Sequence, residues 1–266
     1  MIGLAFVAHL SFFRAHAAGR FFALLPLLGR VMSSLEQVAS RNLILSRMSA
    51  EDFALLQPHL EHISLKLRQR LEMPNKAISH VVFPETGIIS VVARGTGDRH
   101  IEVGIIGREG MTGIPVVMGT DRSPNDTYVQ GKGDGWRIAA DDLRKAMKAS
   151  PSMMSLFQLF THLFLIQASY TALANGRATI DERLARWLLM AQERMDGDKL
   201  MLTHEFLATM LGVRRAGVTI AIGTLVAEGL IASSRGMITI LDNKALLKRT
   251  NGYFGAPERE YRRIFA

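Results

Sequence analysis

The stretch Leu202–Leu241, LTHEFLATMLGVRRAGVTIAIGTLVAEGLIASSRGMITIL, decides the fold of the C-terminal part of the chain. Thr203 precedes apolar residues at helical spacing and can cap the start of a helix. Gly212 stands between two apolar residues and can adopt the positive φ that a tight turn between two steeply crossing helices requires. A second helix is expected from Arg214 to about Glu228, which makes the segment a helix-turn-helix.

The exposed residues of this segment suit contact with DNA. Two arginines begin the second helix, where a recognition helix meets base edges and phosphates. Two short strands follow Gly229 and enclose the turn Ser234–Gly236, which forms the wing of a winged helix-turn-helix. The residues expected to contact double-stranded DNA are Thr203, Arg214, Arg215, Gly217, Thr219 and Arg235, the last at the tip of the wing.

The composition of the whole chain is compatible with a nucleic-acid partner and excludes several cofactors. The 266 residues include 32 Lys and Arg against 24 Asp and Glu, a net charge of +8. From Asp181 to Ala266 the net charge is only +3, so DNA affinity depends on where a few arginines lie. Cysteine is absent, which excludes thiolate zinc sites, cysteine-ligated iron–sulfur clusters and a cysteine nucleophile.

Residues 1–31 differ in character from the rest of the chain. They contain Arg14, Arg20 and Arg30, no acidic residue and many Phe and Leu. The apolar runs are shorter than the about 20 residues that a membrane helix needs, and no positive charge precedes the first run as in a secretory signal. We expect an extension upstream of a folded protein that begins at Met32. The alternative is a surface-seeking segment that tethers the protein to a membrane.

The region 32–150 has the pattern of an antiparallel β domain. Apolar and polar residues alternate over Ile63–Arg68, and short β-rich runs recur along the rest of the region, separated by glycine-containing turns. Such spacing predicts a sandwich, roll or barrel. Within it, we expect Ile114–Met118 to be a strand, and Gly131–Gly135 to be a tight hairpin rather than a phosphate-binding loop.

The sequence of residues 151–177 predicts one long helix with two apolar stripes. One stripe is assigned to packing on the β domain. The other repeats at alternating intervals of three and four residues, like the heptad seam of a coiled coil, and predicts a two-fold homodimer. The alternative is a monomer in which the helix is wholly buried. The first stripe comprises Phe157, Phe160, Phe164 and Ala168, and the dimer seam comprises Leu156, Leu159, Leu163, Ile166, Tyr170 and Leu173.

The predicted fold class is α+β, with an N-terminal antiparallel β-roll or jelly roll, a long central dimerisation helix and a C-terminal winged helix-turn-helix. A further helix begins after Thr179, which can cap it, with Asp181 and Glu182 in the first turn. The expected divisions are the extension 1–31, an effector-sensing roll 32–150, the dimerisation helix 151–177, the winged helix-turn-helix 178–250 and a tail 251–266.

This order of elements resembles the Crp/Fnr family of transcription regulators, from about Leu35 to Asp242. The matching stretches are VFPETGIIS at 82–90, GREGM at 107–111 and the segment 202–241. The resemblance implies a dimeric, promoter-binding regulator whose roll senses a signal and whose central helices relay it. The expected partners are double-stranded DNA, a second copy of the chain, RNA polymerase and a small-molecule effector of unknown identity.

The ligand residues of the family are only partly present. Members that bind cyclic nucleotides carry Gly-Glu and, after a short loop, Arg-Ser/Thr-Ala; the counterparts here lie in 107–110 (GREG) and 121–126 (DRSPND). Because Asp121 and Asp126 flank the arginine and would repel a phosphate, cyclic-nucleotide binding is not expected. The histidines are scattered, so no haem is expected, and no metal site is assigned. The candidate effector-binding residues that the resemblance implies are Glu109, Gly110, Arg122 and Ser123.

The recognition helix also departs from the best-known family pattern. Ala216 and Ile220 stand where Glu and Arg often lie, so the target sequence does not carry over. We expect a cytoplasmic homodimer that binds an inverted-repeat operator and is not an enzyme. The alternatives are a membrane-tethered regulator and a cupin-like metal-dependent enzyme, which needs several His and carboxylate side chains to converge in the roll. The nearby candidates for such a set are His80, Glu85, His100 and Glu102.

Overall fold

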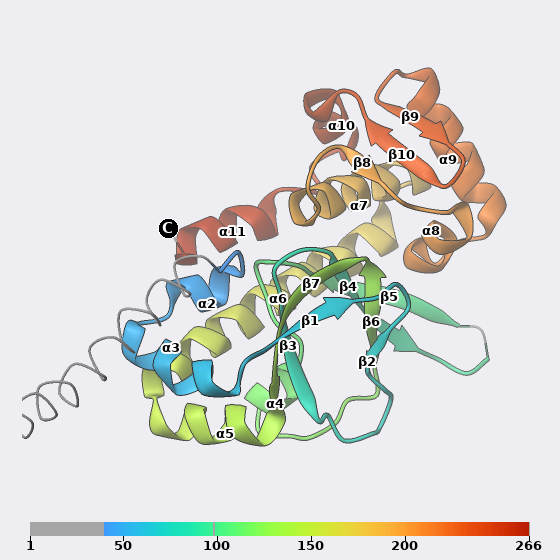
Figure 1. Cartoon of the computed structure of the whole chain (residues 1–266). Helices are drawn as coiled ribbons and strands as arrows, with labels where there is room; N and C mark the ends of the chain where they lie inside the picture. The colour runs from blue at the N-terminus through green and yellow to red at the C-terminus, as the bar shows by residue number, and fades with distance from the viewer. Residues whose placement is uncertain (1–39, 98, 266) are drawn as a thin grey trace, which may run out of the picture.

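The structure, a computed structural model, describes residues 40–97 and 99–265 (Figure 1). Within these ranges, a β-roll, one long helix beside it and a C-terminal winged domain follow each other in the predicted order. The α+β class and the roll-plus-winged-helix architecture are thereby confirmed. The predicted extension 1–31, and with it the membrane-tether alternative, lies outside the described residues.

Two antiparallel sheets form the roll. One has the order β1-β7-β3, with β1 at Glu61–Leu65, β7 at Gly133–Ala139 and β3 at His80–Pro84. The other has the order β2-β6-β4-β5, with β2 at Arg70–Glu72, β6 at Asp126–Gly131, β4 at Ile88–Arg94 and β5 at His100–Ile106. The short helices around the sheets are α2 (Leu43–Arg47), α3 (Ala50–Leu56), the 3₁₀ turn η1 (Gln57–His59), α4 (Ile114–Val117) and α5 (Ala140–Ala149). Phe83, Ile89, Ile106, Val129 and Ile138 are buried in the core of the roll.

Residues Ile114–Val117 form helix α4 and not the predicted strand. Gly113 takes φ 73° and turns the chain, and Pro115 lies in the first turn, where its missing N–H leaves no hydrogen bond unmade. Val116 and Val117 are buried in the roll. This short helix is apolar because it is buried, and a short apolar run of this kind is also typical of a strand.

The segment Gly131–Gly135 is not the predicted hairpin. It is the place where the chain passes from one sheet to the other, because β6 and β7 belong to different sheets. Because Gly133 and Gly135 have no side chain, the backbone here can approach the end of β3 and the turn after it closely. A Cβ atom on Gly133 would lie 2.2 Å from the carbonyl oxygen of Thr86, and one on Gly135 would lie 2.4 Å from that of Phe83.

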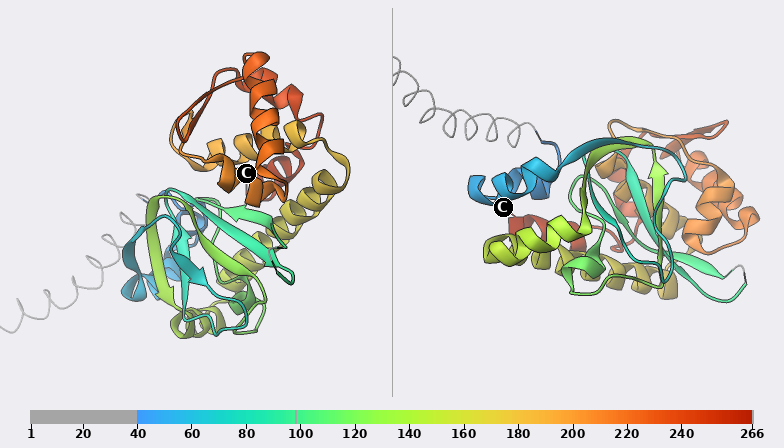
Figure 2. Two further views of the ribbon diagram at one scale, coloured as in Figure 1. Left: turned by 90° about the vertical axis from the view of Figure 1, so that its right-hand side faces the viewer. Right: turned by 60° about the horizontal axis from the view of Figure 1, so that its bottom comes forward.

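Helix α6 (Pro151–Arg177) has the predicted bounds and lies along the roll (Figure 2). It begins where the hydroxyl of Ser150 accepts a hydrogen bond from the N–H of Met153, at 3.1 Å. Phe157 and Phe160 are buried against the roll, as the first stripe predicted. The long helix therefore covers the roll with one face and leaves another open.

The C-terminal domain packs four helices against a small sheet of order β8-β10-β9. Its elements are α7 (Ile180–Arg194), β8 (Lys199–Leu200), α8 (His204–Leu211), α9 (Arg215–Ala227), β9 (Ile231–Ser234), β10 (Met237–Ile240) and α10 (Asn243–Arg249). Helix α7 starts after Thr179, the predicted cap, which forms a capping box with Glu182. The segment predicted as a tail contains a further helix, α11 (Ala256–Phe265), which returns to lie against α6 and near α2 (Figure 1).

Strand β5 joins the roll to the C-terminal domain. The carboxylate of Glu102 is 4% exposed and accepts hydrogen bonds from the hydroxyl of Ser90 (2.5 Å) and from the indole N–H of Trp187 in α7 (2.6 Å). Burial raises the pKa of Glu102 from 4.5 to about 7, although both hydrogen bonds favour the ionised form. The two domains therefore meet at a carboxyl group whose charge changes near neutral pH.

We expect the stability of the chain to fall as the pH rises from about 5 to about 8, because Glu102 must ionise in the folded state but does so readily in the unfolded state. The effect is at most about 3 kcal/mol, the free-energy equivalent of a shift of that size. Glu102→Gln lacks this titratable group. As the pH rises from about 5 to about 8, the variant should therefore lose less unfolding free energy than the wild type. Urea denaturation at several pH values measures it, and a difference that does not vary with pH contradicts the prediction.

Candidate nucleic-acid interface

Helices α8 and α9 form the predicted helix-turn-helix. The hydroxyl of Thr203 accepts a hydrogen bond from the N–H of Phe206 at 3.2 Å and caps α8. Gly212 ends α8 in the left-handed conformation, with φ 60° and ψ 37°. The axis of α9 then lies at 105° to that of α8. The sequence therefore predicted both the cap and the turn.

Side chains of α7 and α10 hold these two helices in place. Trp187 contacts Phe206 edge to face, with ring centroids 5.7 Å apart. Arg183 donates a hydrogen bond to the carbonyl oxygen of Leu211 at the C-terminal end of α8, where a positive charge is favoured by the helix dipole. Arg249 of α10 bonds both Asp181 of α7 and Glu228 after α9. Sequence reasoning missed these four contacts.

The predicted DNA-contacting arginines lie on the surface. Arg214, Arg215 and Arg235 are exposed, and none of their side chains bonds to another described residue. Arg214 is the N-cap residue of α9 and Arg215 its first residue, so both lie at the positive end of the helix dipole. Ile220 is 71% exposed on the same helix.

The other three predicted contact residues have structural roles. The hydroxyl of Thr203 is used as the cap of α8, and that of Thr219 lies 2.9 Å from Nδ1 of His204. Gly217 faces α7, since a Cβ atom there would lie 3.1 Å from Ile180. These residues position α9 on its neighbours, while the arginines are free to reach outward.

A hollow of about 830 Å³ lies between the start of α9 and the β4–β5 hairpin of the roll. Arg94 and Arg99 line it from the hairpin, and Arg214 and Arg215 line it from α9. Among the described residues that line it, Glu205 is the one acidic residue. Although Arg94 pairs with the buried Asp126 at 2.5 Å, Arg99, Arg214 and Arg215 leave an excess of positive charge among the described lining residues, which favours a polyanion.

The four candidate effector residues do not come together. Glu109 points away from the interior of the roll and pairs with Arg194 at the end of α7, at 2.7 Å. Gly110 is pressed against α6, because a Cβ atom there would lie 2.4 Å from the ring of Phe160. Arg122 is exposed and pairs with the adjacent Asp121. Ser123, in contrast, lines a small cavity in the roll.

A buried carboxylate that sequence reasoning missed borders this cavity of about 170 Å³. Glu72 accepts hydrogen bonds from the N–H of Gly113, at 2.7 Å, and from the hydroxyl of Thr127, at 3.1 Å. Burial raises its pKa. The N–H at the start of α4 is thus already bound to an oxygen of the chain itself.

Five of the six predicted seam residues remain accessible on α6. Leu159 and Leu173 are 41% and 48% exposed, and Leu156, Ile166 and Tyr170 are half-buried. Leu163 is buried and lines a cavity between α6 and α11. Helix α11 therefore covers Leu163, one of the six predicted seam positions.

The four candidates for a cupin-like metal centre lie on both sheets of the roll. His80 and Glu85 belong to β3 and the turn after it, whereas His100 and Glu102 belong to β5 in the other sheet. Glu102 is already bonded to Ser90 and Trp187. Among the described residues, the group that could hold a metal ion is a different one, namely His62, Glu85 and Asp134.

The fold is shared by known regulators. The chain is similar to a putative Crp/Fnr-family transcriptional regulator from Eubacterium rectale, with 20% identity, a TM-score of 0.63 and coverage of 79% of this chain and 98% of that one. It is also similar to FixK2 from Bradyrhizobium japonicum, with 16% identity, a TM-score of 0.62 and coverage of 71% and 96%. Residues 182–249 match the family model of the Crp-like helix-turn-helix domain. The chain has the Crp/Fnr fold and a Crp-like helix-turn-helix domain.

The comparison agrees with the Crp/Fnr resemblance inferred from the sequence. The matched range begins in the first turn of α7 and ends at the last residue of α10, so it contains the whole helix-turn-helix and the wing. A search of curated proteins found no match to the chain.

Substitution of Gly212 tests the left-handed turn between α8 and α9 and its contact with Ile101 of the roll. We expect Gly212→Ala to lower the unfolding free energy by about 1–2 kcal/mol, because a left-handed conformation is unfavourable for a residue with a Cβ atom. That Cβ atom would also lie 2.9 Å from the side chain of Ile101. Urea denaturation measures the change. Gly223→Ala in α9 is the matched control, since its Cβ meets nothing within 4 Å and should leave stability unchanged or raise it. Equal losses in both variants contradict the prediction.

Proposed function

We propose that this chain is a sequence-specific DNA-binding transcription regulator that acts as a homodimer on an inverted-repeat operator. The observation that carries the proposal is the start of α9, where Arg214 and Arg215 are exposed and bond to none of the other described side chains, on a helix set at 105° to α8. Such a regulator acts in the cytoplasm, with RNA polymerase as a further partner and a signal received at the roll.

Each exposed residue of the interface has a different task in this proposal. Arg215 donates two hydrogen bonds to the O6 and N7 atoms of a guanine, and Ile220 contacts the methyl group of a thymine. Arg214 and Arg235 bind phosphates on either side of the groove and carry no sequence information. The glycine turn at Gly236, with φ 71°, places Arg235 at the tip of the wing.

Arg215→Ala should weaken binding to the preferred operator by about 1–3 kcal/mol and relax the preference at one base pair of each half-site. The operator is first selected from a random DNA pool, and affinities are then measured by gel shift on the operator and on single-base variants. Arg235→Ala is the control, because loss of a phosphate contact should weaken all sequences equally and reduce the salt dependence by about one counterion. Wild-type affinity and specificity in Arg215→Ala would exclude α9 as the reading helix.

The open face of α6 supports the proposed homodimer. Leu159, Leu165 and Leu173 expose a large part of their side chains on a helix that buries its opposite face in the roll. Although α6 is long and apolar enough to cross a membrane, this packing on a β domain gives it a different partner. A second copy of the same helix covers the seam by symmetry. Two recognition helices then meet successive major grooves about 34 Å apart.

We expect the double variant Leu159→Asp/Leu173→Asp to be monomeric, because two charged residues in the seam would be buried without partners. Size-exclusion chromatography with light scattering measures the mass. Leu55→Asp in α3, a similarly exposed leucine outside α6, is the control and should remain dimeric. A monomeric wild type, or a dimeric double variant, argues against this seam.

The effector of this regulator is not a cyclic nucleotide in our proposal. The cavity of the roll is small and has the carboxylate of Glu72 on its wall, bound to the N–H of Gly113. A phosphate placed there would compete with this carboxylate for the same donor and would be repelled by its charge. The carboxylate of Glu109 is likewise engaged, by Arg194. The signal is therefore of another chemical kind.

A further inference from the structure

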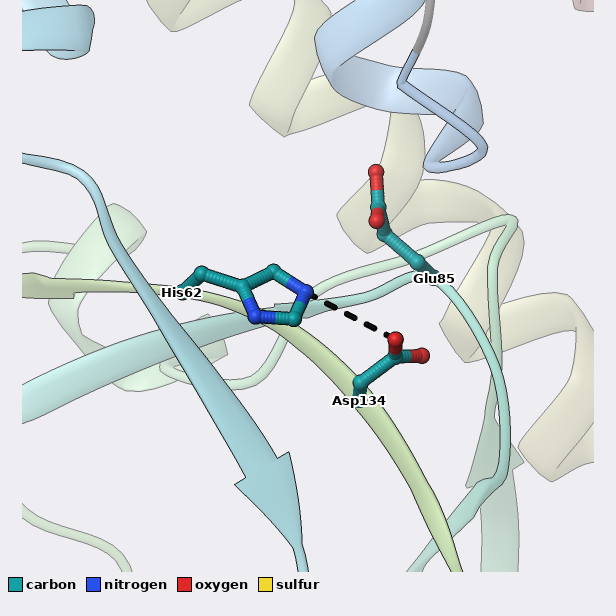
Figure 3. A group of neighbouring side chains, drawn as sticks. All are labelled: His62, Glu85 and Asp134. Carbon is teal, nitrogen blue, oxygen red and sulfur yellow. Dashed lines mark ion pairs between the residues drawn. The ribbon is translucent and has the colours of Figure 1, made fainter.

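Three side chains that can bind a metal ion converge on the outside of the roll (Figure 3). His62 belongs to β1, Asp134 to β7, and Glu85 follows the end of β3. One ligand atom of each lies within 4.8 Å of the other two. Nε2 of His62 lies 3.6 Å from Oδ2 of Asp134. None of these three residues has a part in the proposed DNA binding or dimerisation.

The backbone of the roll fixes this convergence. Strand β7 lies between β1 and β3, so that Asp134 pairs with Ser64 on one side and its neighbour Gly135 pairs with Pro84 on the other. The carbonyl oxygen of Asp134 accepts hydrogen bonds from the N–H groups of Glu85 (2.9 Å) and Thr86 (3.2 Å). The sheet crossing at 131–135, which sequence reasoning took for a hairpin, thereby brings a carboxylate beside Glu85.

Neighbouring groups hold one oxygen of each carboxylate; among the described residues none donates a hydrogen bond to Oε2 of Glu85, and Oδ2 of Asp134 faces His62. Oε1 of Glu85 accepts hydrogen bonds from the hydroxyl of Ser40 (2.9 Å) and the N–H of Arg41 (3.0 Å). Oδ1 of Asp134 accepts one from the hydroxyl of Thr86. Such partners orient the ligands of metal sites. The guanidinium of Arg41 pairs with Asp196 at 2.6 Å, and its positive charge also acts on Asp134 and Glu85, so a bound metal ion has to compete with it.

We propose that His62, Glu85 and Asp134 form a binding site for a divalent first-row metal ion, with Zn²⁺ as its representative. In a tetrahedral zinc site with bonds of about 2.1 Å, ligand atoms lie about 3.4 Å apart. The His62–Asp134 distance of 3.6 Å is already close to this value, and rotation of the partly exposed Glu85 side chain brings the third ligand in.

The donor set determines which ion is bound. One imidazole nitrogen with two carboxylates suits zinc and its neighbours in the first row, whereas Mg²⁺ and Ca²⁺ prefer shells made only of oxygen. His62 and Asp134 are about half exposed, so water can complete the coordination. The two carboxylates supply the charge that the ion neutralises.

Isothermal titration of the full chain, stripped with EDTA and titrated with Zn²⁺, tests the site without any DNA. We expect one ion per chain, and an affinity at least tenfold lower in His62→Ala and in Glu85→Gln. Glu85→Gln keeps the hydrogen bonds from Ser40 and Arg41, so it separates loss of a ligand from loss of the fold. A visible absorption band of bound Co²⁺ that is lost in His62→Ala is the second expected readout.

A matched histidine on the same domain serves as the control. His59 lies 3.7 Å from Asp142 and is exposed to nearly the same extent as His62, but the structure gives it no third ligand. His59→Ala should therefore bind Zn²⁺ like the wild type. The proposal is overturned if the wild type shows no saturable binding, if His59→Ala loses as much affinity as His62→Ala, or if equimolar Mg²⁺ displaces Zn²⁺.

Discussion

Strand β5 is the part of the roll on which the position of every other unit depends. It is an edge strand, and an edge strand presents backbone groups that must be satisfied by something other than a neighbouring strand. The side-chain amide of Gln167 in α6 does this for Ile105, accepting from its N–H at 2.7 Å and donating to its carbonyl oxygen at 3.1 Å. Three residues earlier, Glu102 bonds Trp187 of α7, and Ile101 packs against the glycine turn between α8 and α9. Five consecutive residues thus fix the long helix, the first helix of the winged domain and the helix-turn-helix relative to the same sheet.

The two domains are also held together away from β5. Arg194, the last residue of α7, pairs with Glu109 of the roll, and Asp196 just beyond it binds both Arg41 and Arg108. Helix α11 adds a third connection, because its last residues return to the roll and the carbonyl oxygen of Phe265 accepts a hydrogen bond from Arg47. The connection at Ala178 between α6 and α7 is therefore one of several. The roll is therefore connected to the winged domain through side-chain contacts as well as through the chain.

The sequence was sufficient where local chemistry determines structure. Pro151 after a capping serine set the start of α6, Thr179 and Thr203 set the starts of α7 and α8, and Gly212 set the turn. It was insufficient where the outcome depends on distant partners. Nothing near Glu102 or Glu72 in the chain distinguishes a buried carboxylate from a solvated one, because Trp187 and Gly113 lie 85 and 41 residues away. For the same reason the GKGDG run was mistaken for a hairpin, since its glycines serve an approach to the turn after β3.

The same dependence on partners limits what a family resemblance can transfer. Glu109 occupies the position of a ligand-binding glutamate, yet its carboxylate lies 2.7 Å from a guanidinium, Arg194, whose side chain is only 7% exposed. A ligand that needed this carboxylate would have to break the pair and leave a buried arginine without its counter-ion, which costs several kcal/mol. Glu109 is therefore committed to holding the end of α7 on the roll. The motif retains its residue, and the neighbouring Arg194 gives that residue a structural task that a family resemblance alone does not reveal.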